Sequence, residues 1–190
     1  MVLTSSRLTA IQRARKILQE DLVYLDTETT GLATTDEIIE VAVIDSIGQE
    51  LFNQFVKPTQ QIPSSATAIN GIINEMVKSA LPWPIVWQSL KPLLYNKVIA
   101  SYNDEFDIRM MAQSHKHYGL NWNERLKTFD IMKCYAQFYG EWNPNRQSYK
   151  YFKLADAGAN LHIQLPNSLR AFDDAILTRV VLLAIAHTEI

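Results

Sequence analysis

One stretch constrains this chain more than any other: Val23 to Leu32, where an apolar run meets Asp26, Thr27 and Glu28 before a turn. Apolar and aromatic residues followed by a glycine-containing break predict a buried strand that ends here. Because side chains alternate faces along a strand, Asp26 and Glu28 point the same way, about 6–7 Å apart along the chain. Burying both is costly unless a cation lies between them, and a divalent metal is the simplest candidate. On these residues alone, the alternative is that both acids begin a solvated turn.

Two further apolar runs, at residues 38–44 and 51–56, follow this strand. The turn residues Ser46 to Gln49 separate them, so we expect an antiparallel hairpin. Lys57-Pro58 ends the hairpin because proline cannot donate a hydrogen bond to a strand ladder. With the opening strand, this hairpin forms the core of a predicted sheet.

The rest of the chain alternates between short strands and helices. Ser64-Ser65 is expected to cap a helix that runs to Val77, and further helices are expected over residues 85–95, 103–117, 131–138, 153–161 and 170–187. Short strands are expected over residues 97–101 and 127–130. Residues 81–84 are expected to form a break and residues 140–150 a loop. Strands first, then strand–helix alternation, indicate an α/β fold: a mixed sheet flanked by helices.

The composition fits one domain of 190 residues, since 47% of the residues are hydrophobic. A formal charge of −2 argues against a protein that coats long nucleic acids, but not against an enzyme that holds a few nucleotides through metals. Cys134 is the only cysteine, which excludes an internal disulfide and favours a reducing cytoplasm. The longest apolar run, residues 180–186, is far short of the ~20 residues that cross a bilayer, so we expect no membrane segment.

The N-terminus lacks the apolar core of a secretory signal. Its apolar residues recur at helical spacing: Leu8, Ile11, Ala14, Ile17 and Leu18. We therefore expect residues 1–22 to form an amphipathic helix docked on a domain of residues 23–190.

A second acidic group lies in Asn103-Asp104-Glu105-Phe106-Asp107. The positive end of a helix dipole accounts for Asp104 and Glu105 without any ligand. Asp107 is different because it sits where an apolar helix begins.

A third acidic group, Asp173-Asp174, lies near the start of the last helix. At ~100° per residue, Asp174 falls about 140° from Arg179, which defines the solvent side of this otherwise apolar helix. Helical geometry therefore points Asp174 toward the core, where a lone carboxylate is destabilising. The alternative is a surface pair of acids at a helix start.

Taken together, these groups resemble the three exonuclease motifs of the DEDD superfamily (DnaQ-like 3'-to-5' exonucleases). The motifs are Asp26-Thr27-Glu28, Asn103-x-x-Phe106-Asp107, and Asp174 within Arg-Ala-Phe-Asp-Asp-Ala, in the family's order and spacing from Val23 to the C-terminus. Residues 68–72 also resemble a family segment, with asparagine where His-Gly-Ile is common. The resemblance is closest to the histidine subgroup, which contains the proofreading subunit of bacterial replicative DNA polymerase and ribonuclease T.

The resemblance implies a ribonuclease H-like fold and a 3'-to-5' exonuclease that releases nucleoside monophosphates from single-stranded DNA or RNA ends. It implies two Mg²⁺ or Mn²⁺ ions, held by Asp26, Glu28, Asp107 and Asp174. The substrate-binding residues that it implies are Thr27, Thr29, Gly31, Leu32, Ile72, Asn103 and Phe106. Proofreading, repair and RNA trimming are the roles it suggests, a DNA polymerase is a partner it suggests, and it allows a homodimer.

One departure from the family concerns the general base. The histidine subgroup carries a histidine five residues before its last aspartate, where this chain has Leu169, and the tyrosine subgroup carries tyrosine one residue later, where it has Arg170. Neither side chain accepts a proton. Three explanations stay open: metals alone suffice for slow turnover, another histidine such as His162 substitutes, or the chain is a silent pseudo-exonuclease that binds 3' ends or a polymerase. His115 and His117, at a solvated helix end, are expected at the surface.

Overall fold

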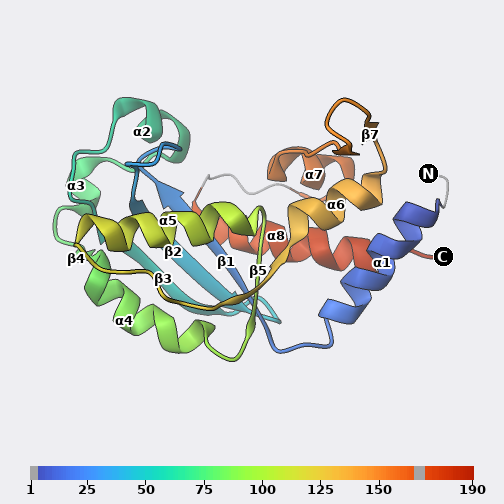
Figure 1. Cartoon of the computed structure of the whole chain (residues 1–190), viewed down its shortest axis with the longest axis horizontal. Helices are drawn as coiled ribbons and strands as arrows, with labels where there is room; N and C mark the ends of the chain where they lie inside the picture. The colour runs from blue at the N-terminus through green and yellow to red at the C-terminus, as the bar shows by residue number, and fades with distance from the viewer. Residues whose placement is uncertain (1–3, 165–169) are drawn as a thin grey trace.

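The computed structural model describes residues 4–164 and 170–190, and a six-stranded sheet forms its centre (Figure 1). The strands are β1 Leu22–Thr29, β2 Ile38–Asp45, β3 Glu50–Lys57, β4 Leu81–Pro82, β5 Val98–Ser101 and β6 Lys127–Asp130. Their order is β4-β3-β2-β1-β5-β6. Strands β1, β2 and β3 pair antiparallel, whereas β5 pairs with β1, β6 with β5 and β4 with β3 in parallel. This mixed sheet confirms the predicted fold class.

Helices cover both faces of the sheet. They are α1 Ser5–Ile17, α2 Ser64–Asn70, α3 Asn74–Val77, α4 Trp83–Leu94, α5 Asp104–His117, α6 Ile131–Tyr139, α7 Leu154–Asn160 and α8 Ala171–Ala186. Figure 1 shows α4 and α5 in front of the sheet and α8 behind it. Helices α1, α6, α7 and α8 share one core with the sheet, and α4 and α5 share the other.

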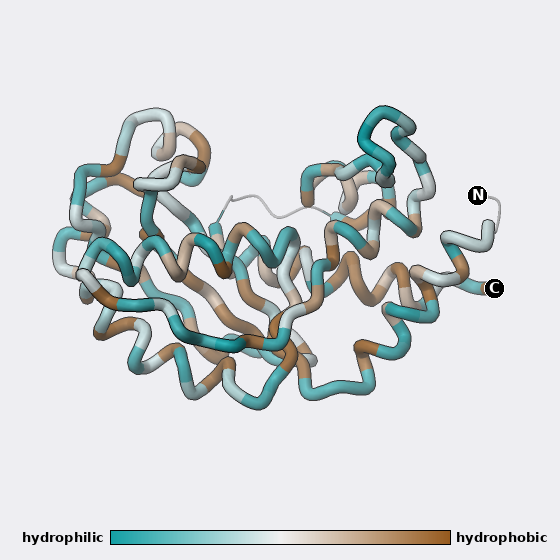
Figure 2. Tube along the Cα trace, viewed as in Figure 1, coloured by the Kyte–Doolittle hydropathy of each residue, from teal (hydrophilic) through white to brown (hydrophobic). Residues whose placement is uncertain are grey.

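The alternation of side chains along β1 divides these two cores. Leu22 and Tyr24 lie in the core beneath α8, while Val23 and Leu25 lie in the core beneath α4 and α5. Figure 2 shows the same pattern as apolar central strands between amphipathic helices. Because the alternation continues, the next two even-numbered residues of β1 face the α8 side at the carboxyl end of the strand.

The expected helix ending at Val77 is instead two short helices. Helix α2 ends at Gly71, whose φ of 72° lies in the left-handed region that favours glycine, and α3 begins after a break. The predicted Ser64-Ser65 cap is wrong, because Pro63 occupies the N-cap position and no side chain caps the helix.

Two other local expectations were wrong in detail. The predicted break at residues 81–84 contains β4 and the first turn of α4, which tolerates Pro84 because the first helical amides need no partner. The predicted loop at residues 140–150 contains a small hairpin, β7 Trp142–Asn143 paired with β8 Ser148–Tyr149.

The expectation that His115 lies at the surface is also wrong. The side chain is buried, and Trp83 Nε1 donates a hydrogen bond to its Nδ1 at 2.8 Å. The rings of Trp87 and Trp122 pack at its sides, 5.3 and 4.8 Å away between centroids. His115 therefore belongs to an aromatic cluster of the α4–α5 core.

Helix α1 packs on the α8 side of the molecule. Ala10, Ile11 and Ala14 are completely buried in that core, and Thr4 caps the helix by accepting a hydrogen bond from the Arg7 amide at 3.2 Å. The division of the chain into residues 1–22 and a domain of residues 23–190 stays a prediction. Over the described residues, every helix is too short or too polar to cross a lipid bilayer.

Candidate active site

The carboxyl end of β1 carries the first two acids of the candidate site. Asp26 and Glu28 follow Leu22 and Tyr24 on the α8 face of the strand, and both are partly buried. Beyond Glu28 the register with β2 shifts. The regular alternation of β1 therefore ends just after it has placed both carboxylates on one side.

Helix α5 brings in the third acid. Asp107 lies in the first turn of α5 and is only 3% exposed. Thr27, which points to the α5 side of β1, donates its hydroxyl to Asp107 Oδ1 at 2.7 Å. The start of this helix is fixed by Asn103, whose φ of 78° turns the chain out of β5. A helix N-terminus favours negative charge, but burial works against it.

Helix α8 brings in the fourth acid from the other layer. Its first intrahelical hydrogen bond runs from the Asp174 amide to the Arg170 carbonyl, at 2.9 Å. Asp174 is partly buried and faces the end of β1, on the inward side that the helical geometry predicts.

All four acids line one cavity of about 240 Å³. Within it, Asp26, Glu28 and Asp174 each offer a carboxylate oxygen, and these oxygens lie within 4.8 Å of one another. Asp107 completes the wall from the side of α5. Three hard oxygen donors at this spacing suit Mg²⁺ or Mn²⁺, so the residues fit the metal that the motifs imply.

The electrostatics of the cavity support the same interpretation. Burial, and then repulsion from Asp107, Asp174, Glu28 and Glu40, raises the pKa of Asp26 well above its usual range. Burial is also the largest cause for the other three acids, raising the pKa of Glu28 to about 8, of Asp107 to about 7 and of Asp174 to about 6. Carboxylates that resist ionisation in this way are stabilised when a cation binds between them.

The predicted substrate-binding residues divide into two sets. Thr27, Thr29, Gly31, Leu32 and Phe106 line the cavity. Asn103 precedes α5 and is not in the lining. Ile72 is 0% exposed inside a separate core and is not in the lining either, whereas Ile69, 67% exposed, lines the cavity.

Sequence reasoning missed three other lining or bordering residues. Asn70 donates its amide to the Thr29 carbonyl at 3.3 Å and also contacts Glu28. Tyr102 lines the cavity beside the predicted Asn103, and Glu40 faces Asp26 and Glu28 from β2. Asn70 stood in a segment singled out by its family resemblance, but only the fold reveals its contact with β1.

The residues that the structure describes place no histidine among the acids. Leu169, the predicted position of the missing base, lies outside the described residues. Over residues 4–164 and 170–190, no histidine lines the cavity. His162, the suggested substitute, is exposed in the turn after α7.

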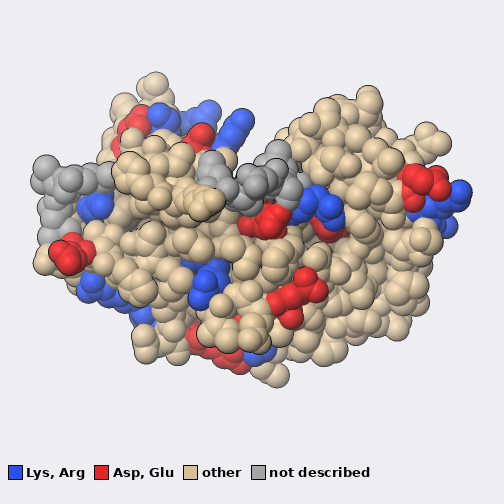
Figure 3. Space-filling model, turned by 180° about the vertical axis from the view of Figure 1, so that it is seen from behind, with Lys and Arg blue, Asp and Glu red and all other residues tan. Residues whose placement is uncertain are grey.

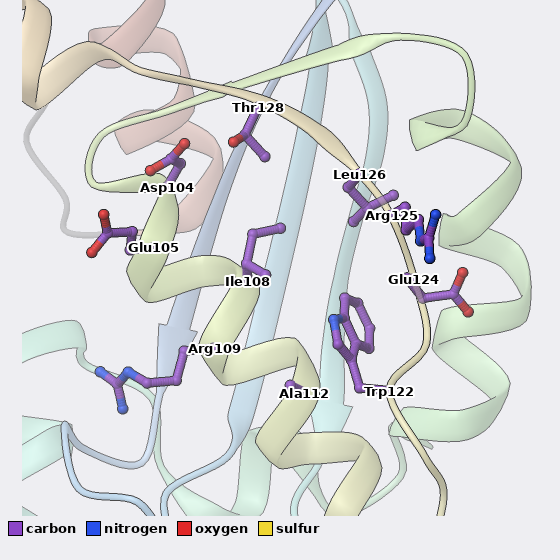
Figure 4. Close-up of a pocket in the computed structure, with 10 residues that line it drawn as sticks. All are labelled: Asp104, Glu105, Ile108, Arg109, Ala112, Trp122, Glu124, Arg125, Leu126 and Thr128. Atoms are coloured by element: carbon purple, nitrogen blue, oxygen red, sulfur yellow. The ribbon is translucent and has the colours of Figure 1, made fainter.

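A larger cavity, of about 430 Å³, lies on the other side of α5 (Figure 4). Figure 4 shows Trp122 and Ile108 facing each other across it. Two of its three acids are engaged elsewhere, since Glu105 pairs with Lys133 and Glu124 with Lys91, which leaves Asp104. It therefore lacks the converging carboxylates of the smaller cavity.

Metal binding at the acidic cavity is expected to depend on pH. The folded protein holds protons on Glu28, Asp107 and Asp174 up to pH 6–8, whereas the unfolded chain releases them near pH 4. Folded protein thus binds more protons between these limits, so the melting temperature without metal falls as pH rises from 5 to 8. Mn²⁺ should raise the melting temperature more at pH 8 than at pH 6, because binding must displace those protons.

Calorimetric titration of Mn²⁺ between pH 6 and 8 measures this directly, with affinity rising about tenfold per pH unit for each proton displaced. Asp174→Asn should reduce the pH dependence of Mn²⁺ affinity, and Asp45→Asn, at the end of β2, should leave it unchanged. Equal Mn²⁺ affinity at all pH values would contradict the assignment.

Comparison with known proteins agrees with the geometry. The RNase_T exonuclease family matches residues 23–178. An uncharacterized exonuclease, CP81, of Escherichia phage 186 is 38% identical over 187 residues, which cover 94% of each chain. The 3'-5' exonuclease DinG of Bacillus subtilis is 28% identical over 175 residues, which cover 88% of this chain but 18% of its own length.

Two solved structures share the fold. Escherichia coli exonuclease I, in a complex with single-stranded DNA, gives a TM-score of 0.68 at 18% identity over 85% of this chain and 39% of its own. Exonuclease X, in a complex with 5' overhanging duplex DNA, gives a TM-score of 0.64 at 23% identity over 86% of this chain and 90% of its own. They confirm the predicted ribonuclease H-like architecture. Together with the match over residues 23–178, these findings place the chain in the RNase_T exonuclease family of the DnaQ-like DEDD superfamily.

Proposed function

We propose that this nuclease is a metal-dependent 3'-to-5' exonuclease that releases nucleoside monophosphates from single-stranded DNA or RNA ends. The observation that carries the proposal is the convergence of Asp26, Glu28 and Asp174, from two layers of the fold, to within 4.8 Å of one another. Buried Asp107 stands beside them in the same cavity. A relative named as a 3'-5' exonuclease supports the polarity.

The four acids would hold the metals, and Thr27 would keep Asp107 in place through its 2.7 Å hydrogen bond. When bound, a pair of Mg²⁺ or Mn²⁺ ions supplies Lewis-acid activation of both the attacking water and the scissile phosphate. The chain itself supplies the position of the carboxylates and a partly enclosed cavity, which strengthens electrostatic interactions within it.

The rim of the cavity suits the last nucleotides of a strand. Leu32, 77% exposed, and Ile69, 67% exposed, line the cavity together with Phe106. Aromatic side chains such as Phe106 stack on bases without sequence preference. At Gly31, a Cβ atom would lie 2.5 Å from the Asp36 carboxylate, so a larger residue would displace this carboxylate from its hydrogen bonds with the Thr30 hydroxyl and the Ala33 amide.

We propose a hollow in the surface as the route for the strand. Figure 3 shows the surface hollowed between two lobes, with acidic and basic side chains at its base. One lobe carries the β7–β8 hairpin with exposed Trp142 and Lys150. Tyr102, which lines the cavity, donates a hydrogen bond to the carbonyl of Phe152 at 2.9 Å and so connects the segment after β8 to the cavity. Aromatic and basic side chains together are typical of single-strand binding surfaces.

A single oligonucleotide assay tests this function. With Mn²⁺, a 5'-labelled single strand should shorten in a ladder from its 3' end, and a 3'-labelled strand should release its label as mononucleotide first. The matched RNA strand shows whether the 2'-hydroxyl is accepted. Release of the 5' label as mononucleotide, or internal cuts in a circular strand, would overturn the proposed polarity.

The second candidate function is a silent relative that binds 3' ends or a polymerase without cutting. It is favoured by the lack of a histidine in the lining of the described cavity. Both functions predict metal binding, so metal binding does not separate them. Mn²⁺-dependent binding of a 3' end without degradation at any pH would support the silent alternative.

A further inference from the structure

A partly buried ion pair joins β2 to the start of α8, directly beside the acidic cavity. Glu40 is 2% exposed, and its Oε2 accepts a hydrogen bond from Arg170 Nε at 2.9 Å. Arg170 Nη2 donates to the other oxygen, Oε1. This two-bond geometry is the strongest and most directional that a carboxylate makes with an arginine.

The same carboxylate also holds the helix backbone. The Ala171 amide donates to Glu40 Oε2 at 3.2 Å, so Glu40 satisfies one of the free amides at the N-terminus of α8. Arg170 in turn accepts the Asp174 amide at its carbonyl, at 2.9 Å. One side chain of β2 therefore fixes both the residue before α8 and the first turn that ends in Asp174.

The position of Glu40 in the sheet gives this contact its importance. Glu40 pairs with Glu28 across the β1–β2 ladder. Asp174 lies one helical turn after Arg170, about 5–6 Å along the axis. The pair thus sets where one predicted metal ligand, on α8, stands relative to another, on β1.

Stability alone is a weak reason for such a pair. A buried ion pair often contributes little, because the desolvation of both charges offsets their attraction. The two hydrogen bonds between Arg170 and Glu40 do fix one geometry. The Phe55 ring lies 4.8 Å from the Arg170 guanidinium and restrains its plane.

We propose that Glu40 and Arg170 are positioning residues that set the Asp174 carboxylate against Glu28 and thereby determine the affinity of the site for divalent metal. The proposal rests on the proposed function in one respect, that Asp174 is a metal ligand.

The test measures Mn²⁺ affinity by electron paramagnetic resonance, separately from nuclease activity. Arg170→Ala should weaken Mn²⁺ binding about 10–100-fold, the usual effect of removing a group that orients a metal ligand. Arg170→Lys keeps the charge but not the planar guanidinium, and Glu40→Gln keeps the shape but not the charge. Both should give a Mn²⁺ affinity between that of Arg170→Ala and that of wild type. In turnover, the Mn²⁺ concentration that gives half-maximal activity should rise, while the KM for the oligonucleotide at saturating Mn²⁺ should stay near that of wild type.

Arg179 provides a matched control. It lies on the same helix and ties α8 to the β2–β3 turn, since its Nε donates to the Ser46 carbonyl at 2.9 Å. Arg179→Ala should therefore loosen the docking of α8 without changing Mn²⁺ affinity. Melting in EDTA shows that each variant is folded.

Folded Arg170→Ala and Glu40→Gln that bind Mn²⁺ as wild type does would overturn the proposal. An equal loss in Arg179→Ala would also overturn it, because general helix docking would then explain the effect. If wild type binds Mn²⁺ but degrades no strand, the proposed exonuclease function is overturned. The positioning role of Glu40 and Arg170 is not, because it is measured by Mn²⁺ affinity.

Discussion

Asp26→Asn is expected to lower exonuclease activity by about 10³-fold or more, and at the same time to raise the melting temperature of the metal-free protein at pH 8. Asp26 is central to the acidic cavity, since repulsion from Asp107, Asp174 and Glu28 adds to burial in raising its pKa. Lewis-acid stabilisation by metal is worth several kcal/mol, and about 4 kcal/mol corresponds to about 10³-fold in rate. Replacing the carboxylate with a neutral amide of the same shape removes both the metal and the repulsion.

This prediction is specific because activity should fall while the melting temperature rises. A change that merely damaged the fold would lower activity and melting temperature together. Asp21→Asn is the matched control, because Asp21 lies just before β1, pairs with Lys97 and is largely exposed. It should leave activity unchanged and the melting temperature within about 1–2 °C, since exposed pairs contribute little. Asp26→Asn with activity within tenfold of wild type would contradict the site.

The sequence predicts the placement of the acids well because each depends on one local rule. Alternation along a buried strand puts Asp26 and Glu28 on one face, and 100° steps along a helix put Asp174 inward. The antiparallel hairpin follows from turn residues between two apolar runs. These features need no knowledge of which elements touch.

Features that depend on contacts between distant elements are not predictable in this way. Glu40 and Arg170 are 130 positions apart, and nothing local in either indicates an ion pair. His115 looks like a surface residue at the end of a helix until Trp83 and Trp122 enclose it.

The segment at residues 68–72 shows the limit within a single motif. Family resemblance singles it out, but it does not say which side chain reaches the cavity. Gly71 ends α2 in a left-handed conformation, and this turn buries Ile72 while Ile69 and Asn70 remain beside the acids. The way in which α2 ends therefore decides which side chain of the segment reaches the cavity.

Leu169→His is expected to raise the rate of strand degradation by about 10²-fold, toward the 10²–10⁴-fold that a general base usually contributes. Leu169 lies outside the described residues, and the prediction rests on its place five residues before Asp174, where the histidine subgroup carries its base. Arg170, at the position of the tyrosine subgroup's base, donates to Glu40 instead. The gain should appear with a new limb in the pH–rate profile near pH 6.5, the usual pKa of histidine.

The control for this substitution is Leu169→Asn, a polar side chain that cannot act as a base near neutral pH. If asparagine gives the same gain, the effect comes from polarity and not from proton transfer. An inert wild type together with an active Leu169→His would establish the silent alternative, because only the base would then be missing. A wild type that cuts, with no gain and no new limb from histidine, would mean that the four acids and their metals are enough for turnover in this chain.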